Sequence, residues 1–329
     1  MTEPRPKQTI PDNWRIHPLI DFSPEARQSC YGFLEHSIAS NDTKQTYRRA
    51  LTRLMAHFAE LGVEDLRDVE PSHIKHYVDG LKEVGKKAAA KSAYYSGKAF
   101  FQHCVEDGVL ATNPAGSVKV KFAKAKRGKT DILKPEQVNT LILCIPDLSG
   151  MPDNPPKQTD MRDRALIAVM AYTFARIGGA LSCRVRDFFY DDGAYWLDMT
   201  EKGEDEHLVP VQPAAADRLK EYIEYCGLTD PNAWLFQSAN RIGSLSGKPY
   251  DRSNSLAMIK RRSKSVLGAD INVKNHTFRA TGIITALNRG KSYELVQEMA
   301  NHIDGETTKL YDRSRRQHLA DAMKDFDYD

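Results

Sequence analysis

Apolar residues recur at helical spacing through the first third of the sequence. They predict three helices: one from a cap at Asn41 or Asp42 to near Gly62, a second starting at Pro71, and a third over about residues 86–107. The inward-facing residues of these helices are Tyr47, Leu51, Leu54, Met55, Phe58, Ile74, Tyr77, Val78, Leu81, Phe100, Phe101, Cys104 and Val105. A compact helical domain is therefore expected in this part of the chain.

Later in the chain, helical patterns are mixed with one strand pattern. Helices are expected at about residues 134–145, 160–175, 177–186, 213–226, 253–267, 277–289 and 292–301. In "AYWLDMTEKGEDEHLVPV", residues 195–200 and 207–211 flank a polar turn, which predicts a β-hairpin. The sequence contains no Gly-rich phosphate loop, so ATP-driven chemistry is not expected.

A basic segment separates the two patterns. With 329 residues, the chain fits about two domains. In "KVKFAKAKRGK", residues 119–129, six of eleven residues are basic and none is acidic. A linker lying along a phosphate backbone explains the absence of acids better than a solvated hinge. The expected organisation is a tail over residues 1–22, a helical domain over 23–118, a linker over 119–131 and a second domain over 132–329 that ends in a short C-terminal helix.

Composition narrows the setting of the protein. No apolar run approaches the length of a membrane span, and "MTEPRPKQTIPDNW" has no apolar signal region. The five cysteines are odd in number and far apart, which predicts neither a disulfide framework nor a zinc site. A cytoplasmic protein is expected. The net charge of +3 does not by itself indicate a nucleic-acid partner, so the distribution of the charge matters more.

Basic residues gather on predicted helix faces and in the linker. We expect them to contact DNA phosphates, with an ordinary solvated face as the alternative. The candidates are Lys44, Arg48, Lys87, Lys91, Lys98, Lys121, Lys124, Arg127, Lys260, Arg261 and Lys264. The last three belong to "SNSLAMIKRRSKSVLG", a helix expected to enter the major groove. Arg261 is the candidate for base contact, because arginine can read guanine with two hydrogen bonds.

Four separate places carry candidate chemistry. They are "FARIGGALSCRVRDF" with Arg176, the hairpin turn with Lys202, "HTFRATG" with His276 and Arg279, and "ANHIDGETTKLYDRS" with His302 and Tyr311. Each is a weak signal alone, since an HxxR pair arises by accident on helix surfaces and a turn lysine is usually only solvated. Arg176 has the alternative role of a buried arginine held by backbone carbonyls.

Taken in order, these segments resemble the tyrosine site-specific recombinases, the phage integrase family. The similarity spans about residues 40–315 and includes "NDTKQTYRRALTRLMAHF" and "GVLATNPAGSV", which resemble the start and end of the family's core-binding domain. His302 stands nine residues before Tyr311, as the family requires. The sequence departs from the family at Gly179, where an acidic residue is usual, and in the acidic residues around Lys202.

The resemblance implies a mainly α fold with a small β-hairpin or sheet, arranged as a two-domain C-shaped DNA clamp. It implies that Tyr311 forms a 3′-phosphotyrosine bond with DNA and that a 5′ hydroxyl of a partner strand then attacks this bond. Arg176 and Arg279 would clamp the scissile phosphate, because guanidinium stays charged and donates paired hydrogen bonds. His276 and His302 would add donors or move a proton, and Lys202 would protonate the leaving oxygen. No metal, ATP or other cofactor is expected.

The expected partners are double-stranded DNA with an inverted-repeat site and further copies of the chain, two on one site and four on paired sites, and no membrane. The protein would act in the cytoplasm, at the nucleoid. Three alternatives stay open: a type IB topoisomerase with nearly the same residues, a DNA-binding regulator on this fold that does not cut, and a metal-dependent nuclease. The nuclease is disfavoured because no clustered carboxylates stand beside His276 or His302.

Overall fold

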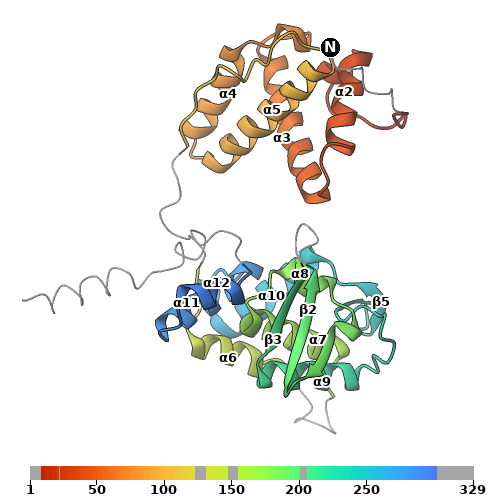
Figure 1. The fold of residues 1–329 in the computed structure, drawn as a ribbon, viewed down its shortest axis with the longest axis vertical. Helices are drawn as coiled ribbons and strands as arrows, with labels where there is room; N and C mark the ends of the chain where they lie inside the picture. Colours follow the sequence, from red (N-terminus) through yellow and green to blue (C-terminus); the bar gives the residue numbers. More distant parts are fainter. Residues whose placement is uncertain (1–8, 22, 123–130, 147–154, 201–205, 302–329) are drawn as a thin grey trace, which may run out of the picture. The chain divides into compact units, whose positions relative to one another are not determined.

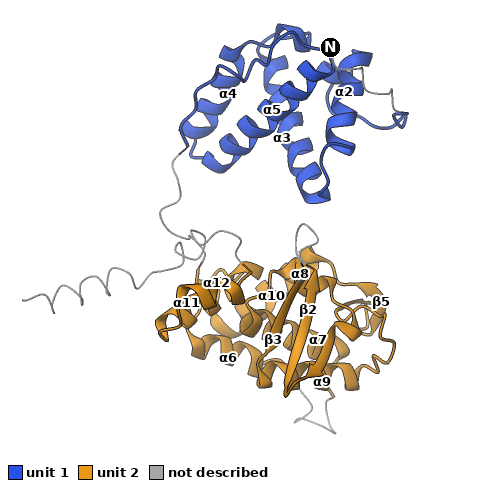
Figure 2. Cartoon of the chain, in the orientation of Figure 1, with its two compact units in different colours: residues 1–124 blue, residues 125–329 orange. Residues whose placement is uncertain are grey.

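The computed structural model describes residues 9–21, 23–122, 131–146, 155–200 and 206–301. The chain divides into two compact units, residues 1–124 and residues 125–329 (Figure 2). Helices dominate both units, and every strand of the described residues lies in the second unit (Figure 1). The expected mainly α fold with small β-structure is therefore confirmed.

The first unit is built around three helices that the apolar pattern predicts. Its elements are α1 (Pro18–Asp21), α2 (Pro24–Glu35), α3 (Asn41–Glu60), a 3-10 turn (Leu66–Asp68), α4 (Pro71–Glu83) and α5 (Lys87–Glu106). Four residues of the predicted stripe of α3, Leu51, Leu54, Met55 and Phe58, are buried in the core, and Tyr47 is half-buried against it. Gly97 of α5 lets α3 approach closely, since a Cβ there would lie 2.9 Å from the Leu54 Cδ2.

The beginning of the chain differs from the expected tail over residues 1–22. Trp14, Ile16, Leu19 and Ile20 are buried in the core of the first unit, and α1 contacts α2 and α3. The indole of Trp14 donates to the Glu35 carboxylate at 3.3 Å. These four apolar residues are too few to show a helical period in the sequence. Their place in the core follows only from their packing against the later helices. Residues 14–21 thus belong to the helical unit.

The second unit is organised around one buried helix. Its helices are α6 (Pro135–Leu143), α7 (Gln158–Thr173), α8 (Ile177–Ser182), α9 (Pro213–Tyr225), α10 (Arg252–Leu267), α11 (Asn275–Asn288) and α12 (Tyr293–Met299), with a 3-10 turn at Val185–Asp187. Helix α7 is buried on all sides over residues 161–170 and contacts α6, α8, α9 and α11. A helix without a solvent face is typical of the centre of a domain.

Two antiparallel sheets accompany these helices. The first has the order β1-β2-β3, with β1 (Phe188–Asp191), β2 (Ala194–Thr200) and β3 (Glu206–Val211). The second pairs β4 (Gln237–Ala239) with β5 (Leu245–Pro249). The expected hairpin corresponds to β2 and β3, and the expectation that it is the only strand region was wrong. β1 is largely exposed and β4 has three residues, so neither shows a clear alternation of buried and exposed residues.

The helix boundaries agree with the predicted ones within two residues, with one exception. The helix expected over residues 177–186 ends at Ser182, because Cys183 adopts an extended conformation, with ψ of 144°, before the 3-10 turn. Asn41 is the first residue of α3, and Ser40 is its cap. Among the described residues, no helix is both long and apolar enough to cross a membrane.

Candidate active site and DNA-binding surfaces

Arg176 and Arg279 approach the same point of the second unit from different elements. Arg279 lies in α11 and is buried, and its Nη1 donates to the carbonyl of Phe174 at 2.6 Å. Its Nη2 donates to the carbonyl of Ala300. Arg176 caps α8, and its Nη2 donates to the carbonyl of Asn301 at 3.2 Å. The two arginines that the sequence predicts to act together thus meet at the end of α12.

Backbone carbonyls orient both guanidinium groups. The hydrogen bond from Arg176 to the Asn301 carbonyl is also expected if Arg176 has only a structural role, as an arginine held by backbone carbonyls. A guanidinium carries five N–H donors in a planar fork, so carbonyls can orient the same side chain that donates to phosphate oxygens. The contact with Asn301 therefore fits the structural role and the catalytic role alike.

His276 shares the electrostatic environment of these arginines. It lies in the first turn of α11, three residues before Arg279, so the two side chains lie on one face of the helix. Loss of hydration, followed by the positive charges of Arg279 and Arg176, lowers the pKa of His276. The lowered pKa favours the neutral imidazole, whose unprotonated ring nitrogen can accept a hydrogen bond or a proton.

His207 is a residue of this site that the sequence reasoning missed. It lies in β3 and is buried, and it hydrogen-bonds the backbone of Glu298 in α12. Burial, then the positive charges of Arg279 and Arg176, lower the pKa of His207, and the bond to Glu298 opposes this effect. The signal was present in "HLVPV", where alternation places His207 on the inward face of the strand with two valines.

Three predicted catalytic residues, Lys202, His302 and Tyr311, lie outside the described residues, so their roles remain predictions. Gly179, the position where the family usually has an acidic residue, is buried in α8. Its carbonyl accepts a hydrogen bond from the Ser182 hydroxyl at 2.8 Å. No side chain at this position supports the arginines.

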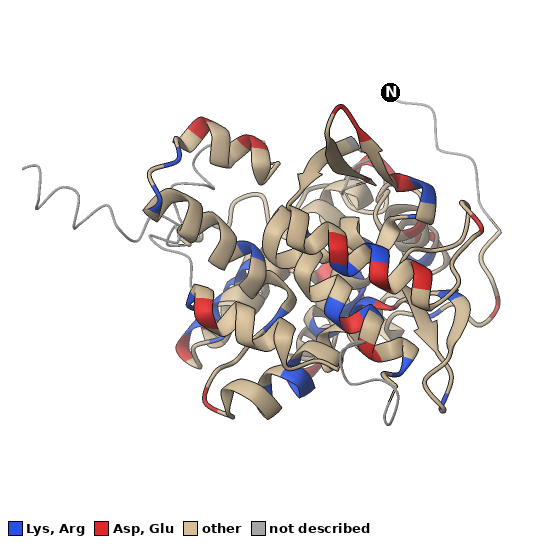
Figure 3. Cartoon of the chain, turned by 90° about the horizontal axis from the view of Figure 1, so that it is seen from below, with Lys and Arg blue, Asp and Glu red and all other residues tan. Residues whose placement is uncertain are grey.

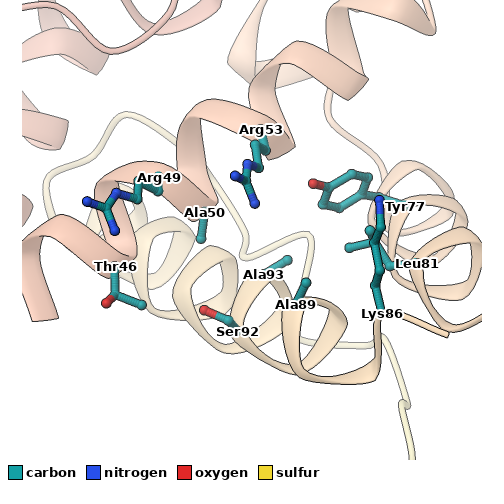
Figure 4. A pocket seen from close by; sticks show the side chains of 10 residues that line it. All are labelled: Thr46, Arg49, Ala50, Arg53, Tyr77, Leu81, Lys86, Ala89, Ser92 and Ala93. Atoms are coloured by element: carbon teal, nitrogen blue, oxygen red, sulfur yellow. The ribbon is translucent and has the colours of Figure 1, made fainter. Parts of the chain in front are cut away.

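Charged residues of both signs are interspersed over the described part of the chain (Figure 3). In the first unit, a pocket of about 470 Å³ lies between α3, α4 and α5. Arg49 and Arg53 of α3 and Lys86 line it together with the hydroxyl groups of Thr46 and Ser92 (Figure 4). Cations and hydroxyl donors in one concave surface suit a phosphate group.

The two basic residues predicted from α3 have other partners. Lys44 donates to the carbonyl of Glu35 at 2.8 Å. Arg48 lies 3.7 Å from the Glu35 carboxylate and stacks over the Trp14 ring at 5.1 Å. Both side chains are therefore held toward the start of the chain and α2, and Arg49 and Arg53 are the arginines of α3 that line the pocket.

The other DNA-contact candidates fall into two groups. The exposed ones are Lys87, Lys91, Lys98, Lys121, Lys260, Arg261 and Lys264, and Lys124 and Arg127 lie outside the described residues. On α10, the neighbouring Arg262 bonds Asp160 and the buried Asp163 of α7, at 2.9 Å for its Nη2 and the Asp163 Oδ2. This ion pair fixes α10 against α7. The side chain of Arg261 is 67% exposed.

No group of three or more His, Cys, Asp or Glu residues within the described ranges could hold a metal ion.

Comparison with known proteins defines the class. The model of the phage integrase family matches residues 132–318, more than half of the chain, and that of the phage integrase N-terminal SAM-like domain matches residues 32–107. These matches define a tyrosine recombinase, an enzyme that cuts and rejoins DNA. The chain belongs to the phage integrase family.

Relatives and solved structures agree with this assignment. The chain is 26% identical to the tyrosine recombinase XerD of Corynebacterium glutamicum over 284 residues, which cover 84% of this chain and 89% of that protein. It is 26% identical to the tyrosine recombinase XerC of Vibrio parahaemolyticus over 282 residues, 85% of each. The fold is similar to that of the XerH recombinase bound to difH substrate in a pre-cleavage complex, with a TM-score of 0.65 at 15% identity, covering 95% of this chain and 99% of XerH.

A lambda integrase dimer bound to a COC′ core site gives a TM-score of 0.63 at 16% identity, covering 88% of this chain and 95% of the integrase. The family match and the recombinase relatives confirm the expected class of activity, site-specific DNA recombination. It is favoured over the topoisomerase-like enzyme and the regulator that does not cut.

Proposed function

We propose that this recombinase cuts DNA by attack of Tyr311 on a phosphate that Arg176 and Arg279 clamp. The convergence of Arg176 and Arg279 from α8 and α11 carries the proposal. A phosphodiester resists a nucleophile because it is an anion, and two guanidinium groups neutralise its non-bridging oxygens in the transition state. The same cations lower the pKa of a nearby phenol and so favour the attacking phenolate.

The strand exchange conserves the number of phosphoester bonds, because each step forms one and breaks one. The Tyr311 oxygen bonds the phosphorus, the bond from phosphorus to the 5′ oxygen breaks, and Lys202 gives that oxygen its proton. The 5′ hydroxyl of a second strand then attacks the 3′-phosphotyrosine and releases the tyrosine. His276 and His302 donate to the phosphate or move the phenol proton. Since one ester replaces another, the reaction needs neither ATP nor a metal.

The DNA substrate in this proposal is a duplex with a short inverted-repeat site. In the first unit, the pocket of Arg49 and Arg53 binds its phosphates, and in the second unit the exposed face of α10 contacts its phosphates and bases. Two protomers occupy one site and four occupy a pair of sites. The similar XerH and lambda integrase structures are bound to DNA, and the latter is a dimer.

An apolar groove of the second unit suits the contact between protomers. It measures about 580 Å³, and Val138, Phe174, Phe278 and Met299 line it together with Arg289 and Lys291. The C-terminal segment carries Leu319, Met323 and Phe326 at i, i+4 and i+7, among several aspartates. We infer that the apolar residues of this segment dock into the groove of a neighbouring protomer, and docking within the same protomer is the alternative. Such head-to-tail contacts close into a ring.

The test uses purified protein and duplex DNA with excess chelator. A DNA adduct that resists denaturation is expected from the wild type and is expected to be absent from Tyr311→Phe, which keeps its DNA affinity because only the phenolic oxygen is lost. An adduct from Tyr311→Phe would show that the nucleophile is misassigned and would direct attention to Tyr293 and Tyr328. Cleavage that stops with the chelator would instead restore the nuclease alternative.

A further inference from the structure

Phe174 has a backbone conformation that its side chain disfavours. It follows α7 directly and has φ of 56° and ψ of 18°, in the left-handed region. An aromatic residue is rarely found there, because its Cβ crowds the backbone, and such a conformation persists only when the surroundings enforce it. The turn lies two residues before Arg176, so it directs the chain into the first arginine.

The second arginine depends on the same residue. The Phe174 carbonyl accepts the 2.6 Å hydrogen bond from the Arg279 Nη1. The orientation of that carbonyl follows from the φ and ψ of this turn. One residue therefore sets the position of Arg176 through the chain and that of Arg279 through a hydrogen bond.

The Phe174 ring fits into a gap on α11, a space that the absence of a side chain at Gly282 leaves open. A Cβ on Gly282 would lie 2.2 Å from both the Cδ1 and the Cε1 of the ring and 3.3 Å from the carbonyl of Ala171. Gly282 lies within the helix and its φ is not positive, so glycine is needed here for space and not for backbone freedom. The ring also packs in one cluster with Ala300, whose carbonyl accepts the other Arg279 bond.

We propose that Phe174 and Gly282 form an interlocking pair that positions Arg176 and Arg279 for the reaction. The ring in the gap of α11 holds the left-handed turn, and the turn holds both guanidinium groups. Phe174 is thus a positioning residue, and Gly282 supplies the space that it occupies. The inference rests on the proposed function, in which the two arginines clamp the scissile phosphate.

The test compares adduct formation at saturating DNA in three variants. Gly282→Ala pushes the ring out of the gap, and Phe174→Gly removes the ring while permitting the turn. Each is expected to slow cleavage by about 100-fold with little change in DNA affinity, because misplacing a catalytic group by about 1 Å has an effect of this size. Gly80→Ala is the matched control, since this helical glycine has open space around it and should cleave normally.

The exchanged variant Phe174→Gly/Gly282→Phe separates positioning from folding. It conserves the volume of the pair and places glycine at the left-handed turn, so it should restore cleavage to within about threefold of the wild type. This rescue does not require the single variants to fold. A double variant that folds and binds DNA but cleaves as slowly as Phe174→Gly would overturn the proposal, as would wild-type cleavage by Gly282→Ala.

A second readout addresses the arginines themselves. A neutral methylphosphonate in place of the scissile phosphate carries less charge for the arginines to neutralise. On this substrate, cleavage by any folded single variant should be slowed less, relative to the wild type, than on the natural phosphate. Equal slowing on the two substrates would mean that the pair acts elsewhere. A wild type that forms no adduct, or a Tyr311→Phe that does, would refute the proposed function, whereas normal cleavage by a folded Gly282→Ala would refute this inference alone.

Discussion

At the scale of single residues, His207 makes the stability of the protein depend on pH. Its pKa is lowered in the folded protein by burial and by Arg279 and Arg176, from an ordinary value of about 6.5. The unfolded chain therefore binds the proton more readily, and folding stability falls as the pH drops below about 6.5. Above that pH both states leave the ring neutral and its contribution is constant.

We expect the free energy of unfolding to fall between pH 7.5 and 5.5 in the wild type and to fall less in His207→Asn, which keeps a hydrogen-bonding group in β3. Denaturant unfolding of both proteins at the two pH values measures the difference. His276 is more exposed and should contribute less. Equal pH dependence in the two proteins would show that His207 is not the group that titrates.

At the scale of elements, α3 presents two pairs of basic residues with different tasks. Arg49 and Arg53 are exposed and line the pocket, whereas Lys44 and Arg48 bond Glu35. Replacing the first pair by alanine should weaken binding to any DNA sequence and lower the slope of log affinity against log salt by about two, since each phosphate contact contributes about 0.9. Binding titrations at several salt concentrations measure this slope.

The matched control replaces Lys44 and Arg48 by alanine. It should keep the salt slope and lower the stability of the protein by about 1 kcal/mol, because surface ion pairs and a cation stacked on an indole contribute that much. If replacing Lys44 and Arg48 changes the salt slope more than replacing Arg49 and Arg53 does, then the face of α3 with Lys44 and Arg48 is the one that contacts DNA. All four residues lie off the apolar stripe of α3, so helical periodicity alone does not separate the two pairs.

At the scale of the whole molecule, assembly is expected to depend on the end of the chain. Deleting residues from Arg316 onward should leave binding to a single half-site unchanged and weaken cooperative binding and site pairing, because the docking stripe of Leu319, Met323 and Phe326 is lost. Gel-shift titrations on half, full and paired sites test this. A truncated protein that pairs sites normally and melts earlier would show that the segment packs within its own protomer.

The sequence alone determined the helices with long apolar stripes, the hairpin and the order of the candidate catalytic residues, whereas most of the predicted linker lies outside the described residues. These follow from periodicity, charge and spacing, which are local properties of the chain. Short elements such as β1, β4 and α1 carry too few residues to show a period. They form through contacts with other segments, such as the pairing of β1 with β2 and the packing of α1 against α2 and α3.

Only the tertiary structure decided which groups meet. Arg176 and Arg279 lie far apart in the sequence and donate to neighbouring carbonyls at the end of α12, those of Asn301 and Ala300. His207 joins them from β3, and the gap at Gly282 receives the ring of Phe174. Such contacts depend on how helices pack, and packing is a sum of many weak interactions between distant segments that no local pattern records.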